Sequence, residues 1–204
     1  PRSLDNPPHD PGKWLDILFV TAKAASNDGQ FSLAYNIARQ LPETYPAGTI
    51  VSERPFAERD TYTDLAWLGG QAAMTQLGRP KDAVALFNLY ANAAQSAQTR
   101  AKGLYWAGRA AEAAGQQELA ASYYNSAGAF FDQFHGQLAL ERLGKPVAPP
   151  PTARVVEVSA AQRDAFERSP LVQAAKYLGA QGLWKEQTRF VRAIAAKATT
   201  DLDA

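Results

Sequence analysis

The sequence has no cysteine, one methionine and two histidines among its 204 residues. The lack of cysteine excludes disulfide bridges and thiolate metal sites, and it leaves the redox compartment open. The two histidines, His9 and His135, are too far apart in the sequence to form a metal-binding motif. Phosphate-binding glycine loops, zinc-protease pairs and nucleophile elbows are also missing. We therefore expect no cofactor, no metal and no catalytic residue in this chain.

The sequence also has no large excess of one charge and no long apolar run. The 21 basic residues nearly balance the 20 acidic residues, which leaves a formal charge of +1. Such a balance gives no global attraction to nucleic acid or to an anionic membrane. Apolar runs such as Ile17–Val20 are far shorter than the roughly 18 to 20 residues that span a bilayer. We expect neither a nucleic-acid partner nor a membrane span.

What the sequence does contain is an imperfect repeat centred on glycines. Around Gly115, alanines stand five residues before and five residues after, and an aromatic residue stands nine after. The same offsets recur around Gly78, and Gly29 has alanine at all three places. The repeated positions are Ala24, Ala34 and Ala38, then Ala73, Ala83 and Phe87, then Ala110, Ala120 and Tyr124. The distance from Gly78 to Gly115 is close to the roughly 34 residues of a tetratricopeptide repeat.

Small residues placed symmetrically about a glycine indicate pairs of antiparallel helices. The glycine takes the left-handed conformation that ends the first helix. Alanine on both sides of the turn lets the two backbones approach closely. Large residues eight and nine positions after the glycine then fill the gap to the next pair. The predicted fold class is all-α, a tetratricopeptide-like superhelix of antiparallel helix pairs.

Proline sets the boundaries of the predicted regions. Three prolines interrupt the segment Leu41–Asp60, which we interpret as an inserted loop before a helix that Thr61 or Thr63 caps. The proline-rich run after Gly144 favours an extended path. Gly182 marks a fourth, degenerate repeat. We predict a superhelical region over residues 1–144, a proline-rich linker over 145–158, which includes an extended segment Val155–Val158, and a linker-type helical region over 159–204.

Three segments closely resemble the helical superstructure of soluble lytic murein transglycosylases. They are Tyr105–Gly115 (YWAGRAAEAAG), the pair Tyr123-Tyr124, and Phe134–Gly144 (FHGQLALERLG). The resemblance is strongest over residues 64–144, and it is specific because the segments occur in the family's order and separation. His135 departs from the pattern, since the family more usually has a second aromatic ring after the phenylalanine.

The resemblance implies a periplasmic enzyme that cleaves the glycan strands of peptidoglycan and leaves anhydromuramoyl ends. In that family a lysozyme-like domain follows the helical region, and its glutamic acid serves as general acid and base. The family's Glu-Ser and Gly-Leu-Met-Gln marks do not occur in this chain. We therefore expect a non-catalytic scaffold that positions glycan strands or the missing C-terminal catalytic domain. The start at Pro1 rather than Met leads us to expect a processed or trimmed product.

Five residues are predicted contacts to the glycan or to the catalytic domain. Trp67 and Tyr105 carry rings that can stack on sugar faces, although such rings in repeat arrays more often belong to the core. Arg100 and Arg109 are candidates for the carboxylates of muramyl peptides, and His135 is a candidate for titration near neutral pH. The alternative is a stand-alone tetratricopeptide-like adaptor that binds a protein or peptide.

Overall fold

The computed structural model describes residues 7–147, 149 and 158–197. Within these residues every regular element is a helix and none is a strand, which confirms the predicted all-α class. Contacts between residues divide the chain into two compact units, 1–150 and 151–204. Most of the predicted linker, including residues 155–157 of the predicted extended segment, lies outside the described residues.

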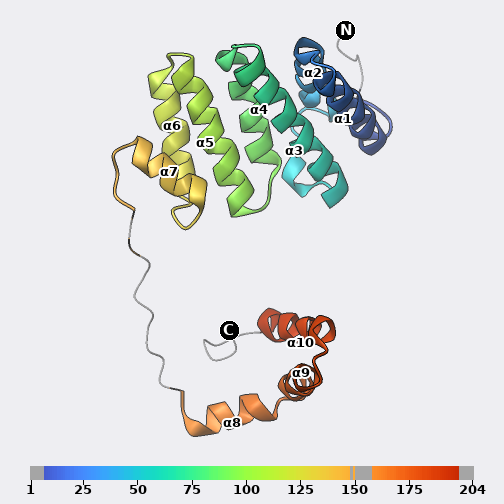
Figure 1. Ribbon diagram of the computed structural model, residues 1–204, viewed down its shortest axis with the longest axis vertical. Helices are drawn as coiled ribbons and strands as arrows, with labels where there is room; N and C mark the ends of the chain where they lie inside the picture. The colour runs from blue at the N-terminus through green and yellow to red at the C-terminus, as the bar shows by residue number, and fades with distance from the viewer. Residues whose placement is uncertain (1–6, 148, 150–157, 198–204) are drawn as a thin grey trace. The chain divides into compact units, whose positions relative to one another are not determined.

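The first unit is a series of antiparallel helices that lie side by side in chain order (Figure 1). Each helix packs on the next, and α1 also contacts α3 while α5 also contacts α7. The order of contacts is that of helix pairs stacked on one another. The helices are α1 (Pro11–Asn27), α2 (Phe31–Ala38), α3 (Phe56–Gln71), α4 (Pro80–Ala93), α5 (Ala97–Ala113), α6 (Gln117–Gly128) and α7 (Phe134–Arg142).

Local signals explain the starts of α1 and α4, whereas the predicted start of α3 differs from the structure. The side chain of Asp10 accepts a bond from the Lys13 amide, 3.1 Å away, and proline supplies the first residue of both α1 and α4. The predicted start of α3 at Thr61 or Thr63 is wrong, because the helix begins at Phe56, directly after Pro55. A proline disfavours helix at the residue before it, but it is compatible with a helix that begins directly after it. The inserted loop therefore ends at Pro55 and is shorter than predicted.

Glycine turns join the two helices of each pair, as predicted. Gly29, Gly78 and Gly115 have φ angles of 75°, 61° and 74°, in the left-handed region that favours glycine. The residue after Gly115 donates its amide proton to the carbonyl of Ala111, at 2.9 Å, which closes a Schellman cap. At Gly78 the equivalent hydrogen bond, from the Arg79 amide to the Ala73 carbonyl, spans one residue more than the bond at Gly115. The π-helical turn η3 (Ala72–Gln76) before Gly78 accounts for that extra residue.

Most of the predicted small residues lie buried between the helices, but the tightest crossings involve glycines that the repeat did not mark. The alanines on both sides of Gly78 and Gly115 are at most 2% exposed. Ala24 is exposed, and its neighbour Ala25 is buried instead, so the prediction is wrong there. A Cβ added at Gly70 or at Gly108 would lie within 3 Å of the ring of Phe87 or of Tyr124, respectively. Phe87 and Tyr124 therefore pack against a glycine of the other helix in their own pair, whereas the prediction placed them toward the next pair, which the Phe87 ring also reaches through Trp106, with 6.0 Å between the ring centroids.

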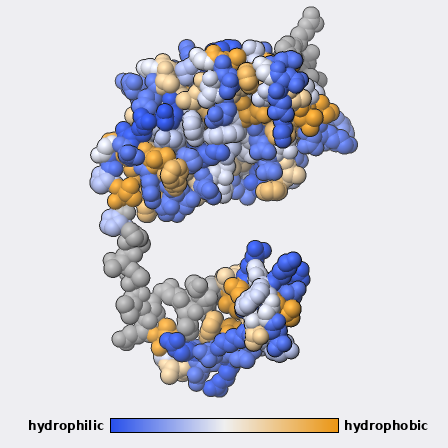
Figure 2. All heavy atoms as spheres, viewed as in Figure 1, coloured by the Kyte–Doolittle hydropathy of each residue, from blue (hydrophilic) through white to orange (hydrophobic). Residues whose placement is uncertain are grey.

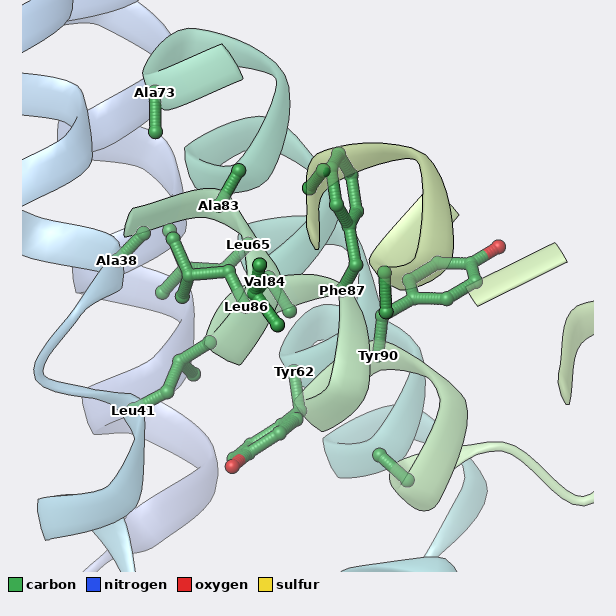
Figure 3. Close-up of a cluster of buried hydrophobic side chains, with 14 of the residues drawn as sticks. Ala38, Leu41, Tyr62, Leu65, Ala73, Ala83, Val84, Leu86, Phe87 and Tyr90 are labelled. Carbon is green, nitrogen blue, oxygen red and sulfur yellow. The ribbon is translucent and has the colours of Figure 1, made fainter. Parts of the chain in front are cut away.

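The core of the first unit runs from α1 to α7 and contains few polar atoms. Leu65 of α3 and Leu86 of α4 are fully or almost fully buried next to Ala38 of α2, as Figure 3 shows. Phe87 and Tyr90, also on α4, extend the cluster toward α5. Because every pair shares its apolar face with the next, no pair buries a complete core alone.

The second unit contains α8 (Ala160–Arg168), α9 (Pro170–Ala180) and α10 (Trp184–Ala196). Ser159 and Gln162 form a reciprocal capping box at the start of α8. Gly182, with a φ angle of 70°, joins α9 and α10 in the same way as the glycines of the first unit. Their close approach uses Gly179 against Gln187 in place of the alanine pair, which fits the degenerate repeat that the sequence predicts. Figure 2 shows hydrophobic residues scattered among hydrophilic ones on the visible face of each unit.

Candidate binding surface

A row of aromatic rings crosses α3, α5 and α7 in the first unit. The ring centroids of Trp67 and Trp106 are 5.8 Å apart, those of Trp106 and Tyr105 are 6.1 Å apart, and those of Tyr105 and His135 are 5.6 Å apart. These spacings are typical of edge-to-face and tilted ring pairs. Tyr105 is buried, and the other three side chains are half-buried. We call these four residues the aromatic row.

The repeat itself places the rings of the aromatic row together. Trp106 and His135 each stand nine residues before a glycine that ends its helix, Gly115 and Gly144. Tyr105 stands ten residues before Gly115, and Trp67 stands eleven before Gly78 because the π-helical turn adds one residue. Two equivalent contacts follow, Trp67 with Trp106 and Tyr105 with His135. The row is therefore a product of the stacking of successive pairs.

Lys102 provides a cation over the start of the aromatic row. The Lys102 ammonium lies 3.6 Å from the ring centroid of Trp67 and 5.3 Å from that of Tyr90. Burial lowers the pKa of Lys102, and the carboxylate of Asp64 acts in the opposite direction. Burial also raises the pKa of Asp64, with a further contribution from Asp60. A ligand that meets this surface therefore finds a half-buried ammonium among rings, with a carboxylate close by.

A second cation, Arg109, lies over Trp106 and Tyr105, with its guanidinium 5.9 and 6.0 Å from the two ring centroids. Its guanidinium donates to the Tyr105 hydroxyl at 3.3 Å and lies 3.7 Å from a carboxylate oxygen of Glu112. The hydroxyl of Tyr124 donates to that same carboxylate oxygen at 2.9 Å. Burial and the Glu112 carboxylate together raise the pKa of Tyr124. This network joins α5 to α6, so Glu112 holds Arg109 beside the aromatic row.

The structure brings four of the five predicted site residues together. Trp67, Tyr105, Arg109 and His135 all belong to the aromatic row or contact it. Arg100 does not, because its guanidinium lies over the ring of Phe130, with 5.4 Å between them. Arg100 and Lys102 are two residues apart on α5, which is about 200° around a helix. Arg100 therefore faces a groove on the other side of α5.

Lys102 and Asp64 are the residues that the sequence prediction missed. Lys102 stands four residues before Trp106, so both lie on one face of α5, and this spacing is a usable signal. No equivalent signal exists for Asp64, because its approach to Lys102 depends on how α3 packs against its neighbours. The prediction selected aromatic rings and arginines. It did not select Lys102, because a lysine on a helix is usually exposed to solvent.

The described side chains on this surface are aromatic rings, cations and carboxylates. Burial, together with the positive charge of Lys102, lowers the pKa of His135, so its ring is neutral at pH 7. Within the described ranges no three histidine, aspartate or glutamate side chains gather closely enough to hold a metal ion. No described helix is both long enough and apolar enough to cross a membrane.

Comparison of the chain with protein-family models, with curated proteins and with solved structures gives no match.

Proposed function

We propose that this chain is the non-catalytic helical scaffold of a periplasmic peptidoglycan lytic transglycosylase. In this proposal the aromatic row holds a glycan strand and presents it to a separate lysozyme-like domain. The observation that carries the proposal is the continuity of the row, which links Trp67 on α3 to His135 on α7 through Trp106 and Tyr105. The three segments that resemble the transglycosylase family include three of these four residues.

The chemistry of the surface suits a polymer of sugars that carries acidic peptides. Half-buried rings offer apolar edges and faces, which match the C–H faces of pyranose rings. Lys102 places one cation over Trp67 and Arg109 places another over Trp106, at positions suited to the carboxylates of the attached peptides. Because the row repeats with the helix pairs, successive sugars of one strand meet the half-buried rings of Trp67, Trp106 and His135, while the buried Tyr105 ring packs between Trp106 and His135. Such a surface binds and orients a strand without cutting it.

The proposal is tested by binding to purified peptidoglycan sacculi in a pull-down of the chain. The variant Lys102→Gln should weaken binding about two- to fivefold, because one partly exposed cation contributes about 0.5–1 kcal/mol. The matched control is Lys81→Gln, which removes an exposed lysine of α4 that has no ion pair within the described residues. It should bind like the unchanged chain.

Two binding results would contradict the proposal, and one activity result would refute a part of it. If the unchanged chain is not enriched on sacculi, or if Lys102→Gln and Lys81→Gln bind equally, the aromatic row is not a glycan surface. The first of these results would favour the tetratricopeptide-like adaptor. Release of anhydromuropeptides by the chain alone would refute the non-catalytic part of the proposal.

A further inference from the structure

A groove lies between α4, α5 and α6, on the side of α5 that faces away from Lys102. Its volume is about 460 Å³. One wall carries Asn88 and Asn92 of α4, and the opposite wall carries Ser122 and Tyr123 of α6. Leu104 forms part of the floor. We call this site the Arg100 groove, because Arg100 of α5 lies at its edge with its guanidinium over Phe130.

Three polar side chains of the Arg100 groove, those of Asn88, Asn92 and Arg100, make no hydrogen bond or ion pair with another described residue, whereas the Ser126 hydroxyl donates to the Ser122 carbonyl at 3.0 Å. Asn88 and Asn92 are one helical turn apart on α4, so their carboxamides lie on the same face. Neither carboxamide makes a hydrogen bond to another described residue. Arg100 makes no ion pair with any carboxylate in the described ranges, and its one side-chain contact of note is with the Phe130 ring. The groove therefore presents a free cation and two free amides.

These groups select one chemical class of ligand. A guanidinium pairs with a carboxylate through two parallel hydrogen bonds. A carboxamide carries both a donor and an acceptor, which match the C=O and N–H of a peptide group. Leu104 and the rings of Tyr123 and Phe130 give apolar surface for a side chain. A neutral sugar would use the amides but would leave the Arg100 charge unpaired.

We propose that the Arg100 groove binds the carboxylate-bearing end of an extended peptide. Arg100 holds the terminal carboxylate, Asn88 and Asn92 pair with the peptide backbone, and the floor accepts one side chain. The volume is within the roughly 300–1,000 Å³ of small-ligand pockets. This site does not rest on glycan binding by the aromatic row, because the two surfaces lie on different sides of α5.

The test is an NMR titration of the isotopically labelled full chain with N-acetyl-trialanine. A parallel titration uses the same peptide with its C-terminal carboxylate converted to an amide. The carboxylate form should shift the side-chain signals of Asn88, Asn92 and Arg100, and it should bind about tenfold more tightly than the amide form. Arg100→Gln should remove this preference. Arg39→Gln, which changes an exposed arginine outside the groove, should preserve it.

The inference is overturned by an absence of shifted groove signals at millimolar peptide, by equal affinity for the carboxylate and amide forms, or by an unchanged preference in Arg100→Gln. Shifts confined to Trp67 and Trp106 would assign the peptide to the aromatic row and would also overturn it. Far-UV circular dichroism checks that Arg100→Gln is folded, and Arg100→Lys, which keeps the charge without the two-pronged geometry, should show an intermediate preference. Lys102→Gln tests the glycan proposal and Arg100→Gln tests the groove, so the two proposals fail separately.

Discussion

The contact between α4 and α5 depends on the absence of a side chain at Gly103. A Cβ added there would lie 2.8 Å from both the backbone nitrogen and the Cβ of Ala91, and 2.7 Å from the ring of Tyr90. Ala91 has no rotamer that moves its atoms away, so relief requires the two helices to separate. We therefore predict that Gly103→Ala destabilises the protein, although alanine is the better helix former.

The magnitude follows from two opposing terms. Overpacking of a rigid core costs about 1–3 kcal/mol, and contact with backbone atoms places Gly103→Ala near the upper value. Replacement of a helical glycine by alanine gains about 1 kcal/mol. The expected net loss is about 2 kcal/mol, which lowers the midpoint of thermal unfolding by about 4–8 °C in a chain of this size.

Gly12→Ala is the matched control, because an added Cβ at Gly12 would meet its nearest atoms at 3.6 and 3.7 Å, which is ordinary contact. Gly12 lies in the first turn of α1, so the control should gain part of the helix-propensity term and unfold at the same temperature or slightly above. Thermal unfolding followed by far-UV circular dichroism measures both variants. If Gly103→Ala is as stable as the unchanged chain or as Gly12→Ala, the close crossing of α4 and α5 is not rigid and the reasoning fails.

Two further predictions concern titration and the network at Glu112. The lowered pKa of His135 means that the unfolded chain takes up its proton first, so stability present above pH 6.5 should fall as the pH drops through the folded pKa. The free energy of unfolding, measured by urea titration from about pH 7.5 to 5, should therefore depend less on pH in His135→Phe than in the unchanged chain. If its dependence on pH is the same in both, His135 is not the group responsible. Tyr124→Phe removes the bond to Glu112 and should cost about 1 kcal/mol in urea unfolding. Tyr123→Phe, whose hydroxyl bonds to no described residue, should cost almost nothing, and equal losses in the two variants would refute the role of the bond.

The sequence was sufficient for the class of fold and for the positions of its turns. Glycine at 29, 78 and 115 is a local requirement, since only glycine takes a positive φ angle without cost, and the structure confirms all three. The start of α3 was wrong because a proline gives two opposite signals, excluding helix before it and favouring helix after it. The choice between these signals depends on contacts made by the segment, such as the Tyr45 hydroxyl donating to Glu58 at 2.7 Å.

The candidate site was predictable only in part. Aromatic residues and arginines could be chosen by type, and four of the five chosen lie together. Trp67 and Tyr105 occupy equivalent places in successive helix pairs, but Trp67 stands eleven residues before its glycine and Tyr105 stands ten before its own. The π-helical turn causes this difference, so the count from the glycines does not show that the two residues are equivalent. The side of α5 that each residue faces also could not be read from type, and it separates Arg100 from the aromatic row.

The sequence by itself determined local properties: where helices end, which faces are apolar, and that the chain lacks cysteine and a strong net charge. These depend on backbone preferences and composition within a few residues. Only the tertiary structure decided which helices approach through glycine, that Lys102 lies over Trp67, and that Asn88, Asn92 and Arg100 share one groove. Such contacts join residues of different helices, and they depend on the distance and rotation at which those helices pack.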